Sequence, residues 1–493
     1  MVNSTVLHLL GWALACLTVL MAIAGIAAIG LGEWSQAGIF FVNVCVSGFF
    51  AGALIIGFQG RAERLGRRDT SILLLAVWVV LPVISAFPLF ALGGFQRMDQ
   101  ALFEAVSGIT TTGATTLTEL SLVYKSVIFW RALLQWFGGA LTLLSAVLVL
   151  APFGVLSTPI NITIPGYERD DLAKSVFATA RHIMPTYGLI TLACVILLWA
   201  TGLPTFDAMC IALSTVSTGG FMPADGGLAA YDSPMAEFVI AMFMIAGATS
   251  FLAHRAALLR VAGSHGDNQE TWYLAFLILV AGATLSALLA NAQVLGEGAG
   301  TVSGADALRY GFFRAVSLIT TTGFDNAEAG AAGVPFACVL SLCAIGGASF
   351  STAGGLKVFR AFSMVAQAHR ELKRLIHPRG ITKAHSTGKP IDIQIMKTIW
   401  SVFFVFLTAM AAVSVALGAE GVPVEQAVMA ALSGLTNTGP AVFMTALDVV
   451  EGQANVYGTL SPFAVLVLCG AMVLGRIEFL VMLSLGLMIF AKR

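Results

Sequence analysis

The octapeptide SGITTTGA at residues 107–114 decides the fold of this chain, because close relatives of it recur three more times. The copies are STVSTGGF at 214–221, SLITTTGF at 317–324 and SGLTNTGP at 433–440, and all four align without a gap. Each copy begins with Ser, has Gly at its seventh position, and follows an Ala two residues upstream. A period of roughly one hundred residues predicts four structural repeats around one axis.

The composition indicates that these repeats lie in a membrane. Of 493 residues, 58% are hydrophobic and 11% are charged, and the mean hydropathy is +0.90. These values are far outside the range of soluble proteins and predict a polytopic membrane protein. The seven cysteines form no CxxC or Cys/His metal spacing, so we expect neither a disulfide nor a zinc site.

Apolar stretches predict an all-α fold of about ten transmembrane helices and four re-entrant pore loops. Two leading spans, 10–31 and 39–58, carry no signature, and the first lacks the cationic start of a cleaved signal peptide. Four modules follow, each with a span, a shorter segment that ends in the signature, and a second span. The paired spans are 72–92 and 127–150, 187–203 and 235–252, 272–289 and 335–358, and 395–417 and 462–490.

These modules predict five units along the chain. A two-helix addition at 1–68 precedes repeats at 69–155, 156–256, 257–380 and 381–493. The shorter segments are 98–112, 204–219, 305–322 and 423–438. A helix of about 12 residues cannot cross about 30 Å, so each segment must return to the side that it entered from.

The signature supplies the return limb, and four such limbs would line a pore. Carbonyl oxygens of an extended, small-residue limb can replace the water shell of an alkali cation, and the carboxyl end of the preceding helix favours a cation. A single copy is more often a turn or helix-packing motif; four aligned copies favour a filter. The candidate ion-binding residues are Thr111, Thr112, Gly113, Thr218, Gly219, Gly220, Thr321, Thr322, Gly323, Asn437, Thr438 and Gly439.

Charges predict the orientation. Arg61, Arg64, Arg67 and Arg68 follow the second span and, with the basic segment 357–397, indicate the cytoplasmic side. Both termini are then cytoplasmic. Acidic residues gather on the outer side, where they would concentrate cations, although each alone is more often a solvated loop charge: Asp99, Glu119, Asp207, Asp225, Asp232, Asp325, Glu328, Glu425 and Asp448.

The stretch GGASFSTAGG at 346–355 interrupts the second span of the third repeat. A stretch so rich in Gly, Ser and Thr makes a poor helix, so it is either a loop beneath the filter or a kinked helix end. Arg476 stands in the last span, where a buried cation suggests function, and Glu478 lies on another helical face. The candidate gate residues are Gly346, Gly347, Ser351, Thr352, Gly354, Gly355 and Arg476.

Together with the four limbs, the motifs WRALLQWFGG (130–139), GGASFSTAGGLKVFR (346–360), ELKRLIHPRG (371–380) and LGRIEFL (474–480) resemble the Trk/Ktr/HKT potassium transporter superfamily. The two leading spans are most similar to its TrkH/TrkG branch. The resemblance implies a potassium-type filter, because all four filter positions are Gly, and a gate at 346–355 with Arg476 facing the pore. In this chain Phe350 stands where relatives usually carry Gly.

The resemblance also implies a bacterial inner-membrane homodimer with a cytoplasmic, nucleotide-binding regulatory ring of the TrkA type. The chain itself has no nucleotide fingerprint or nucleophile motif, so we expect no cofactor, no catalysis and no nucleic-acid partner. The basic residues Arg370, Lys373, Arg374, Arg379, Lys383 and Lys389 could dock the ring, or they could only fix topology and contact anionic lipid.

We therefore expect channel-like potassium uptake. The alternative is a sodium- or proton-coupled symporter with alternating access. Such carriers are often built from inverted repeats, whereas these four repeats share one orientation because two crossings separate each from the next. An intramembrane enzyme would need a catalytic dyad or metal cluster, which the sequence does not contain.

Overall fold

The computed structural model describes residues 3–60, 66–153, 172–258, 269–294, 304–326, 333–377, 385–386, 389–390, 393–445 and 456–477. Within these ranges the chain is almost entirely helical, which confirms the all-α prediction. The strands β1 (His385–Ser386) and β2 (Lys389–Pro390) form a two-residue antiparallel pair.

The long helices follow the predicted spans. Seven described helices are long and apolar enough to cross a membrane, and an eighth crossing results if the bent pair α8 and α9 is counted as one. They are α1 (Ser4–Gly30), α2 (Trp34–Gly57), α3 (Arg67–Leu92), α5 (Lys125–Phe153), α6 (Leu172–Ala200), α10 (Gln269–Val294) and α14 (Ile393–Ala419). The other second spans are α8 (Pro234–Ala248) with α9 (Phe251–Leu258), α12 (Phe336–Ile345) and α16 (Pro462–Ile477).

Two of these spans are not straight helices. The chain bends by 101° between α8 and α9, so the prediction of one continuous span at 235–252 was wrong. The span predicted at 335–358 stops at Ile345 and resumes as α13 (Val358–Ile376), as the Gly-rich interruption suggested. The end of the predicted span 462–490, and Glu478 with it, lies outside the described residues.

Four shorter helices precede the signatures: α4 (Met98–Ile109), α7 (Thr205–Val216), α11 (Gly304–Ile319) and α15 (Val424–Thr436). Each one includes the first three or four residues of its signature. The irregular limb is therefore shorter than the octapeptide. The 3₁₀ helices η1 (Leu120–Leu122) and η2 (Gly227–Tyr231) follow limbs one and two, whereas η4 (Gly439–Met444) begins inside limb four.

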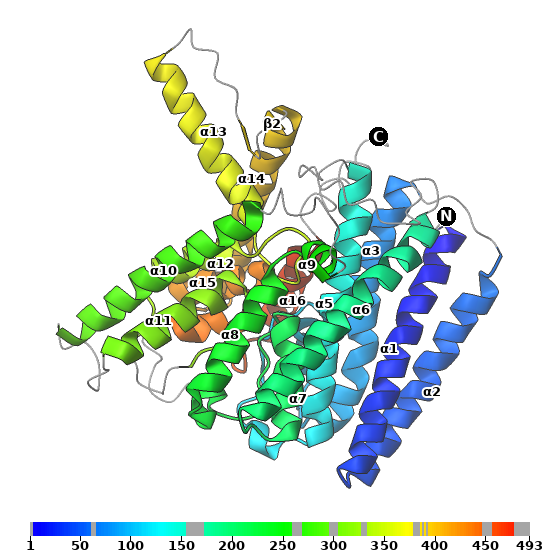
Figure 1. The fold of residues 1–493 in the computed structure, drawn as a ribbon. Helices are drawn as coiled ribbons and strands as arrows, with labels where there is room; N and C mark the ends of the chain where they lie inside the picture. The colour runs from blue at the N-terminus through cyan, green and yellow to red at the C-terminus, as the bar shows by residue number, and fades with distance from the viewer. Residues whose placement is uncertain are drawn as a thin grey trace.

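Short helices pack between long ones around the centre of the molecule. Helix α4 contacts α3, α5 and α16, α7 contacts α5, α6 and α8, α11 contacts α8, α10 and α12, and α15 contacts α12, α14 and α16. Helix α16 lies near the middle of Figure 1, whereas α1 and α2 lie at one edge and α13 projects from the body. The predicted unit boundaries agree with this order but stay a prediction.

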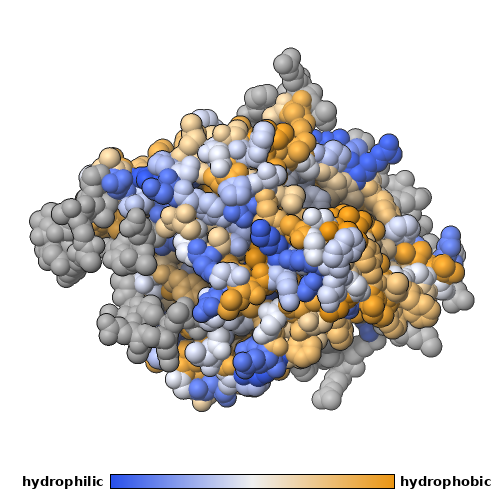
Figure 2. Space-filling view, turned by 90° about the horizontal axis from the view of Figure 1, so that it is seen from below, coloured by the Kyte–Doolittle hydropathy of each residue, from blue (hydrophilic) through white to orange (hydrophobic). Residues whose placement is uncertain are grey.

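Large apolar side chains point outward from the peripheral helices. Phe49 and Ile56 on α2, Trp272 on α10 and Val415 on α14 are each more than 70% exposed. Apolar surface of this extent suits lipid rather than water. Hydrophilic residues instead gather across the middle of the face in Figure 2, which is the face predicted to be outermost.

Candidate functional site

All four short helices end in the same backbone arrangement. The N–H of the sixth signature residue donates to the carbonyl of the first Ser, over 2.7–3.0 Å, from Thr112, Gly219, Thr322 and Thr438. The N–H of the fifth residue donates to the second, over 3.0–3.4 Å. This pair of bonds is a Schellman motif, which closes the last helical turn and sends the chain off as a separate limb.

The fifth residue of every limb has a left-handed backbone. The φ angles are 53° at Thr111, 52° at Thr218, 59° at Thr321 and 54° at Asn437. Thr rarely adopts this conformation, which costs about 1 kcal/mol or more per residue. None of these four carbonyl oxygens accepts a hydrogen bond from a residue in the described ranges, so each limb presents one uncommitted acceptor at the same position.

The four limbs contact one another in cyclic order. Each seventh-position glycine lies so close to another limb that a Cβ placed on it would overlap an atom of that limb. A Cβ on Gly113 would lie 2.1 Å from the Gly219 carbonyl oxygen, and one on Gly220 would lie 2.4 Å from that of Thr322. A Cβ on Gly323 would lie 2.7 Å from Cδ of Pro440. A Cβ on Gly439 would lie 2.1 Å from the N atom of Ala114 in the first limb. Consecutive limbs therefore form a closed ring.

The fourth limb differs from the other three. Gly113, Gly220 and Gly323 have φ between 79° and 89°, whereas Gly439 begins the 3₁₀ helix η4 without a positive φ. Its N–H donates to the Thr112 carbonyl at 2.6 Å. The Asn437 side chain also donates to Thr112 Oγ1 at 3.0 Å. The ring is therefore closed by direct hydrogen bonds between the fourth limb and the first.

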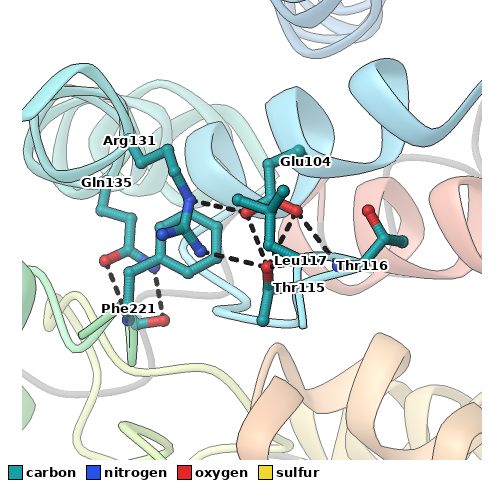
Figure 3. Close-up of polar contacts among 8 residues, drawn as sticks. Glu104, Thr115, Thr116, Leu117, Arg131, Gln135 and Phe221 are labelled. Carbon is teal, nitrogen blue, oxygen red and sulfur yellow. Dashed lines mark hydrogen bonds and ion pairs between the residues drawn. The ribbon is translucent and has the colours of Figure 1, made fainter. Parts of the chain in front are cut away.

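A buried ion pair supports the first limb. Arg131 Nε on α5 donates to Glu104 Oε1 on α4 at 2.6 Å, and both side chains are at most 2% exposed. The same carboxylate accepts from the Thr115 hydroxyl and the Thr116 N–H, just past the limb (Figure 3). The Glu104 carboxylate, on the helix before the limb, is thus bonded to the residues directly after the limb.

The third limb has a corresponding tie, in which the residue on the short helix is basic and its partner past the limb is acidic. Arg314 aligns with Glu104, and Asp325 aligns with Thr115. Arg314 donates from Nε and Nη2 to the two carboxylate oxygens of Asp325 over 2.9 and 3.0 Å. Limbs one and three are therefore held by polar pairs, whereas the aligned positions in limbs two and four carry apolar residues.

Limb two is held from outside its own repeat. Gln135 of α5 donates from Nε2 to the Gly219 carbonyl at 2.6 Å and accepts from the Phe221 N–H at 3.2 Å. Figure 3 shows Arg131 and Gln135 leaving the same helix toward limbs one and two. Limb two thus differs from the others at Gly219, whose carbonyl is bonded to a side chain of another repeat.

The stretch 346–355 is a closed loop rather than a kinked helix end. At its neck, the Leu356 N–H donates to the Ala344 carbonyl at 2.9 Å, and the Val358 N–H donates to the Gly347 carbonyl at 2.9 Å. A Cβ on Gly346 would lie 2.2 Å from the Gly354 carbonyl oxygen. Only glycine permits this approach of the two strands of the neck.

The loop lies directly beneath the limbs and against the bend between α8 and α9. Its Ala348 and Thr352 N–H groups donate to the carbonyls of Ala248 and Gly247 over 2.8 and 3.1 Å. The Thr352 hydroxyl donates to the carbonyls of Val216 and Gly247 over 3.1 and 3.0 Å. These bonds join the broken spans of repeats two and three.

Further contacts join the loop to the rest of repeat three and to repeat four. The Gly354 N–H donates to Thr321 Oγ1 at 2.7 Å, and the Ser349 N–H donates to the Glu270 carboxylate of α10 at 2.7 Å. A Cβ on Gly354 would lie 1.9 Å from the Thr436 carbonyl oxygen. The loop is therefore packed against the third and fourth limbs as well as against repeat two.

Arg476 joins the loop to the first limb. Its Nε donates to the Thr110 carbonyl at 2.5 Å, and its Nη1 donates to the Thr352 carbonyl at 2.8 Å. The residue is 6% exposed, and no carboxylate among the described residues pairs with it. The candidate gate residues are thus brought together with the candidate filter residues.

One of the acidic residues predicted to lie on the outer side has specific partners. Asp225 accepts from the N–H groups of Leu120 and Ser121 over 2.7 and 2.9 Å and so links the segments after limbs one and two. Partial burial alone would raise the pKa of Asp225, but these hydrogen bonds outweigh it and the pKa is lowered. Glu328 and Asp448 lie outside the described residues.

On the opposite face, α13 carries part of the basic segment. Arg370 and Arg374 contact Glu371 over 3.3 Å, and Lys373 is exposed. Leu372, Leu375 and Ile376 on the same projecting half are also exposed. Arg379 and Lys383 lie outside the described residues.

Sequence reasoning missed four positioning features: the Glu104–Arg131 pair, the Gln135 contacts, the Glu270–Ser349 bond and the bend at 248–251. One signal was available for the bend, because GATSF at 247–251 is similar to GASF at 347–350. Another was Gly219, the one sixth-position glycine among the four signatures.

Comparisons with known proteins agree on one group. The family model described as TrkH, cation transport protein, matches residues 39–488. The Trk system potassium uptake protein TrkH of Salmonella typhimurium strain LT2 is 31% identical over 87% of this chain and 88% of its own length. TrkG of Escherichia coli K12 is 28% identical over 89% of each chain. The crystal structure of the potassium transporter TrkH from Vibrio parahaemolyticus matches with a TM-score of 0.86 and 27% identity, over 98% of both chains.

Proposed function

Because the chain belongs to the TrkH family of cation transport proteins, which are transporters and not enzymes, we propose that it takes up potassium across the bacterial cytoplasmic membrane through a channel-like pore. The names of its relatives support potassium as the transported ion. The apolar helices support passage through a bilayer. The basic residues on one face support an orientation with both termini in the cytoplasm.

One observation carries the proposed filter. Four uncommitted carbonyl oxygens, those of Thr111, Thr218, Thr321 and Asn437, stand at the same position of four limbs that contact one another in a ring. Carbonyl oxygens in such a ring can replace the hydration shell of a potassium ion. The seventh-position glycines permit the close approach of neighbouring limbs that the ring requires.

The test replaces each filter glycine by Ser, as Gly113→Ser, Gly220→Ser, Gly323→Ser and Gly439→Ser. Each added side chain would overlap the next limb, widen the ring and weaken the preference for potassium over sodium. If the displacement removes about 1.4 kcal/mol of differential binding, preference should fall about tenfold. Competitive ⁸⁶Rb⁺ uptake in a host deficient in potassium uptake measures this change.

Gly188→Ser is a matched control, because no atom lies within 4 Å of the Cβ position of this glycine on α6. It should take up rubidium with the parent's ion preference. Four filter variants that reach the membrane and retain the parent's preference would refute the carbonyl-ring filter.

We also propose that the loop 346–355 is the gate and that Arg476 holds it closed. Its position beneath the limbs and its bonds to three repeats support this role. Passive, proton-linked and sodium-linked flux differ in which gradient drives uptake. Reconstituted ²²Na⁺, proton and ⁸⁶Rb⁺ fluxes under each gradient separate the channel from the coupled symporter.

Family membership supports a homodimer and a cytoplasmic regulatory ring of the TrkA type as partners of the chain. The projecting, partly basic helix α13 directly follows the gate loop and supports this face as the docking site. In this proposal the nucleotide is bound by the partner, and the present chain binds only the transported ion.

A further inference from the structure

The second limb lacks a side chain at one position where the other three limbs carry Thr. The sixth signature residues are Thr112, Gly219, Thr322 and Thr438. A Cβ on Gly219 would lie 2.4 Å from Cδ and 2.5 Å from Oε1 of Gln135. The carboxamide of Gln135 therefore occupies the space that a Thr side chain would take in limb two.

The same carboxamide bonds the backbone on both sides of Gly220. It donates to the Gly219 carbonyl at 2.6 Å and accepts from the Phe221 N–H at 3.2 Å. This is how a peptide group of a neighbouring strand would pair with an extended chain. An ionised carboxylate cannot donate and a hydrocarbon can do neither, whereas the amide satisfies both partners at any pH.

Arg131 contacts the same limb beside Gln135. Arg131, one turn earlier on α5, is paired with Glu104 at 2.6 Å, and its guanidinium carbon lies 4.0 Å from the ring centroid of Phe221. Two adjacent side chains of α5 therefore contact limb two, and Arg131 is anchored in repeat one (Figure 3).

We propose that Gln135 is a positioning residue for ion selectivity: its carboxamide fixes the two peptide units that flank Gly220, and with them the left-handed backbone of limb two. The inference rests on the proposed filter. Selectivity of a carbonyl ring depends on how firmly its oxygens are held, and in limb two this constraint comes from a neighbouring repeat.

The first experiment compares the parent with Gln135→Glu, purified and reconstituted in proteoliposomes. The variant keeps the side chain's size but sets a carboxylate oxygen against the Gly219 carbonyl. We expect preference for ⁸⁶Rb⁺ over Na⁺ to fall about tenfold, the effect of losing one buried hydrogen bond. Thr142→Val is the control, because among the described residues the Thr142 hydroxyl bonds only to the Gly138 carbonyl of its own helix, α5.

The second experiment tests the steric contact by rescue. Gly219→Ala alone should give little monodisperse protein, because its Cβ overlaps Gln135. Gln135→Ala/Gly219→Ala should recover the yield, because the carboxamide is gone, but it should stay about tenfold less selective than the parent.

Parent-like selectivity in either Gln135→Glu or the double variant would overturn the role of Gln135, as would a normal yield of Gly219→Ala. If Gln135→Glu fails to insert, the double variant decides the question. A parent protein that itself fails to prefer ⁸⁶Rb⁺ to Na⁺ would instead overturn the proposed filter, so the two failures can be told apart.

Discussion

At the scale of a single residue, Arg476 is a buried positive charge that is bonded to carbonyl oxygens, with no carboxylate partner among the described residues. A guanidinium this deeply buried is costly unless it is paired or fully hydrogen-bonded. Here it donates to two carbonyl oxygens, one on the first limb and one on the gate loop, while Nη2 has no partner in the described part of the chain. The residue could oppose cations by its charge, or it could tether the loop to the limb.

Arg476→Lys separates the two roles. Lysine keeps the positive charge, but a single ammonium cannot present the planar fork that reaches both carbonyls. We expect Arg476→Lys to raise basal ⁸⁶Rb⁺ flux nearly as much as Arg476→Ala, by about tenfold or more if one charge-assisted bond is lost. Flux assays on both variants without any regulator measure this, and a Lys variant that stays closed would assign the barrier to charge alone.

Phe350 illustrates how packing outweighs backbone preference. It has φ of 57° in the gate loop, where the family resemblance placed a glycine. The left-handed conformation costs about 1–2 kcal/mol, whereas burying a Phe side chain contributes about 1.5–3 kcal/mol. Phe350 is 6% exposed, so the buried ring offsets the strain that glycine would avoid.

At the scale of elements, the two broken spans are hydrogen-bonded to each other at their breaks. The bend between α8 and α9 supplies carbonyls to the gate loop, and the loop's Phe350 carbonyl accepts from the Phe251 N–H at 3.2 Å. The loop therefore cannot leave its position without breaking bonds to repeat two. In the proposed gate, both breaks would therefore have to move together.

Thr352→Val tests this coupling, because it keeps the side chain's shape and removes its hydroxyl bonds to Val216 and Gly247. The Val216 carbonyl would lose its hydroxyl donor, whereas the Gly247 carbonyl would keep the Thr352 N–H, so the closed loop should be destabilised by about 1–3 kcal/mol. We expect higher basal ⁸⁶Rb⁺ flux and a lower midpoint of thermal unfolding. Ser341→Ala, which deletes an exposed hydroxyl bonded within α12, is the control; equal flux in both variants and the parent would argue against the coupling.

At the scale of the whole molecule, α13 is positioned to transmit a force from a bound partner to the proposed gate loop. The helix starts at Val358, directly after the loop neck, and its projecting half carries both basic and exposed apolar side chains. A docked regulatory ring would pull on the neck, whereas contact with anionic lipid would use the same charges without nucleotide dependence.

Charge reversal at Arg370, Lys373 and Arg374 to Glu distinguishes these uses of α13. We expect loss of binding to a purified TrkA-type ring and loss of nucleotide-dependent activation, with the filter's ion preference unchanged. A pull-down and an ⁸⁶Rb⁺ flux assay with the ring measure both effects. Normal ring binding by a correctly inserted variant would mean that the ring docks elsewhere.

The sequence predicted what depends on local composition. Hydropathy located the spans, as the agreement of 72–92 with α3 and of 395–417 with α14 illustrates, and the repeated octapeptide located the limbs. The sequence's one sign of the bend after Ala248 was the short similarity of GATSF (247–251) to GASF (347–350), which hydropathy does not register because apolar residues resume directly beyond it. The sequence could not predict left-handed threonines or the partner of Gln135, since both depend on which helix packs against which limb.

The closed ring of limbs belongs to one polypeptide, and this has a consequence for how such a protein can evolve. In a pore built from four identical chains, a substitution that costs 0.5 kcal/mol per limb acts four times and changes an equilibrium about thirtyfold. In this chain the same substitution acts once and changes it about twofold. Successive mutations can therefore change ion preference in small steps. The fourth limb differs from the others in its side chain at Asn437 and in its backbone at Gly439, which is the pattern that such stepwise change would leave.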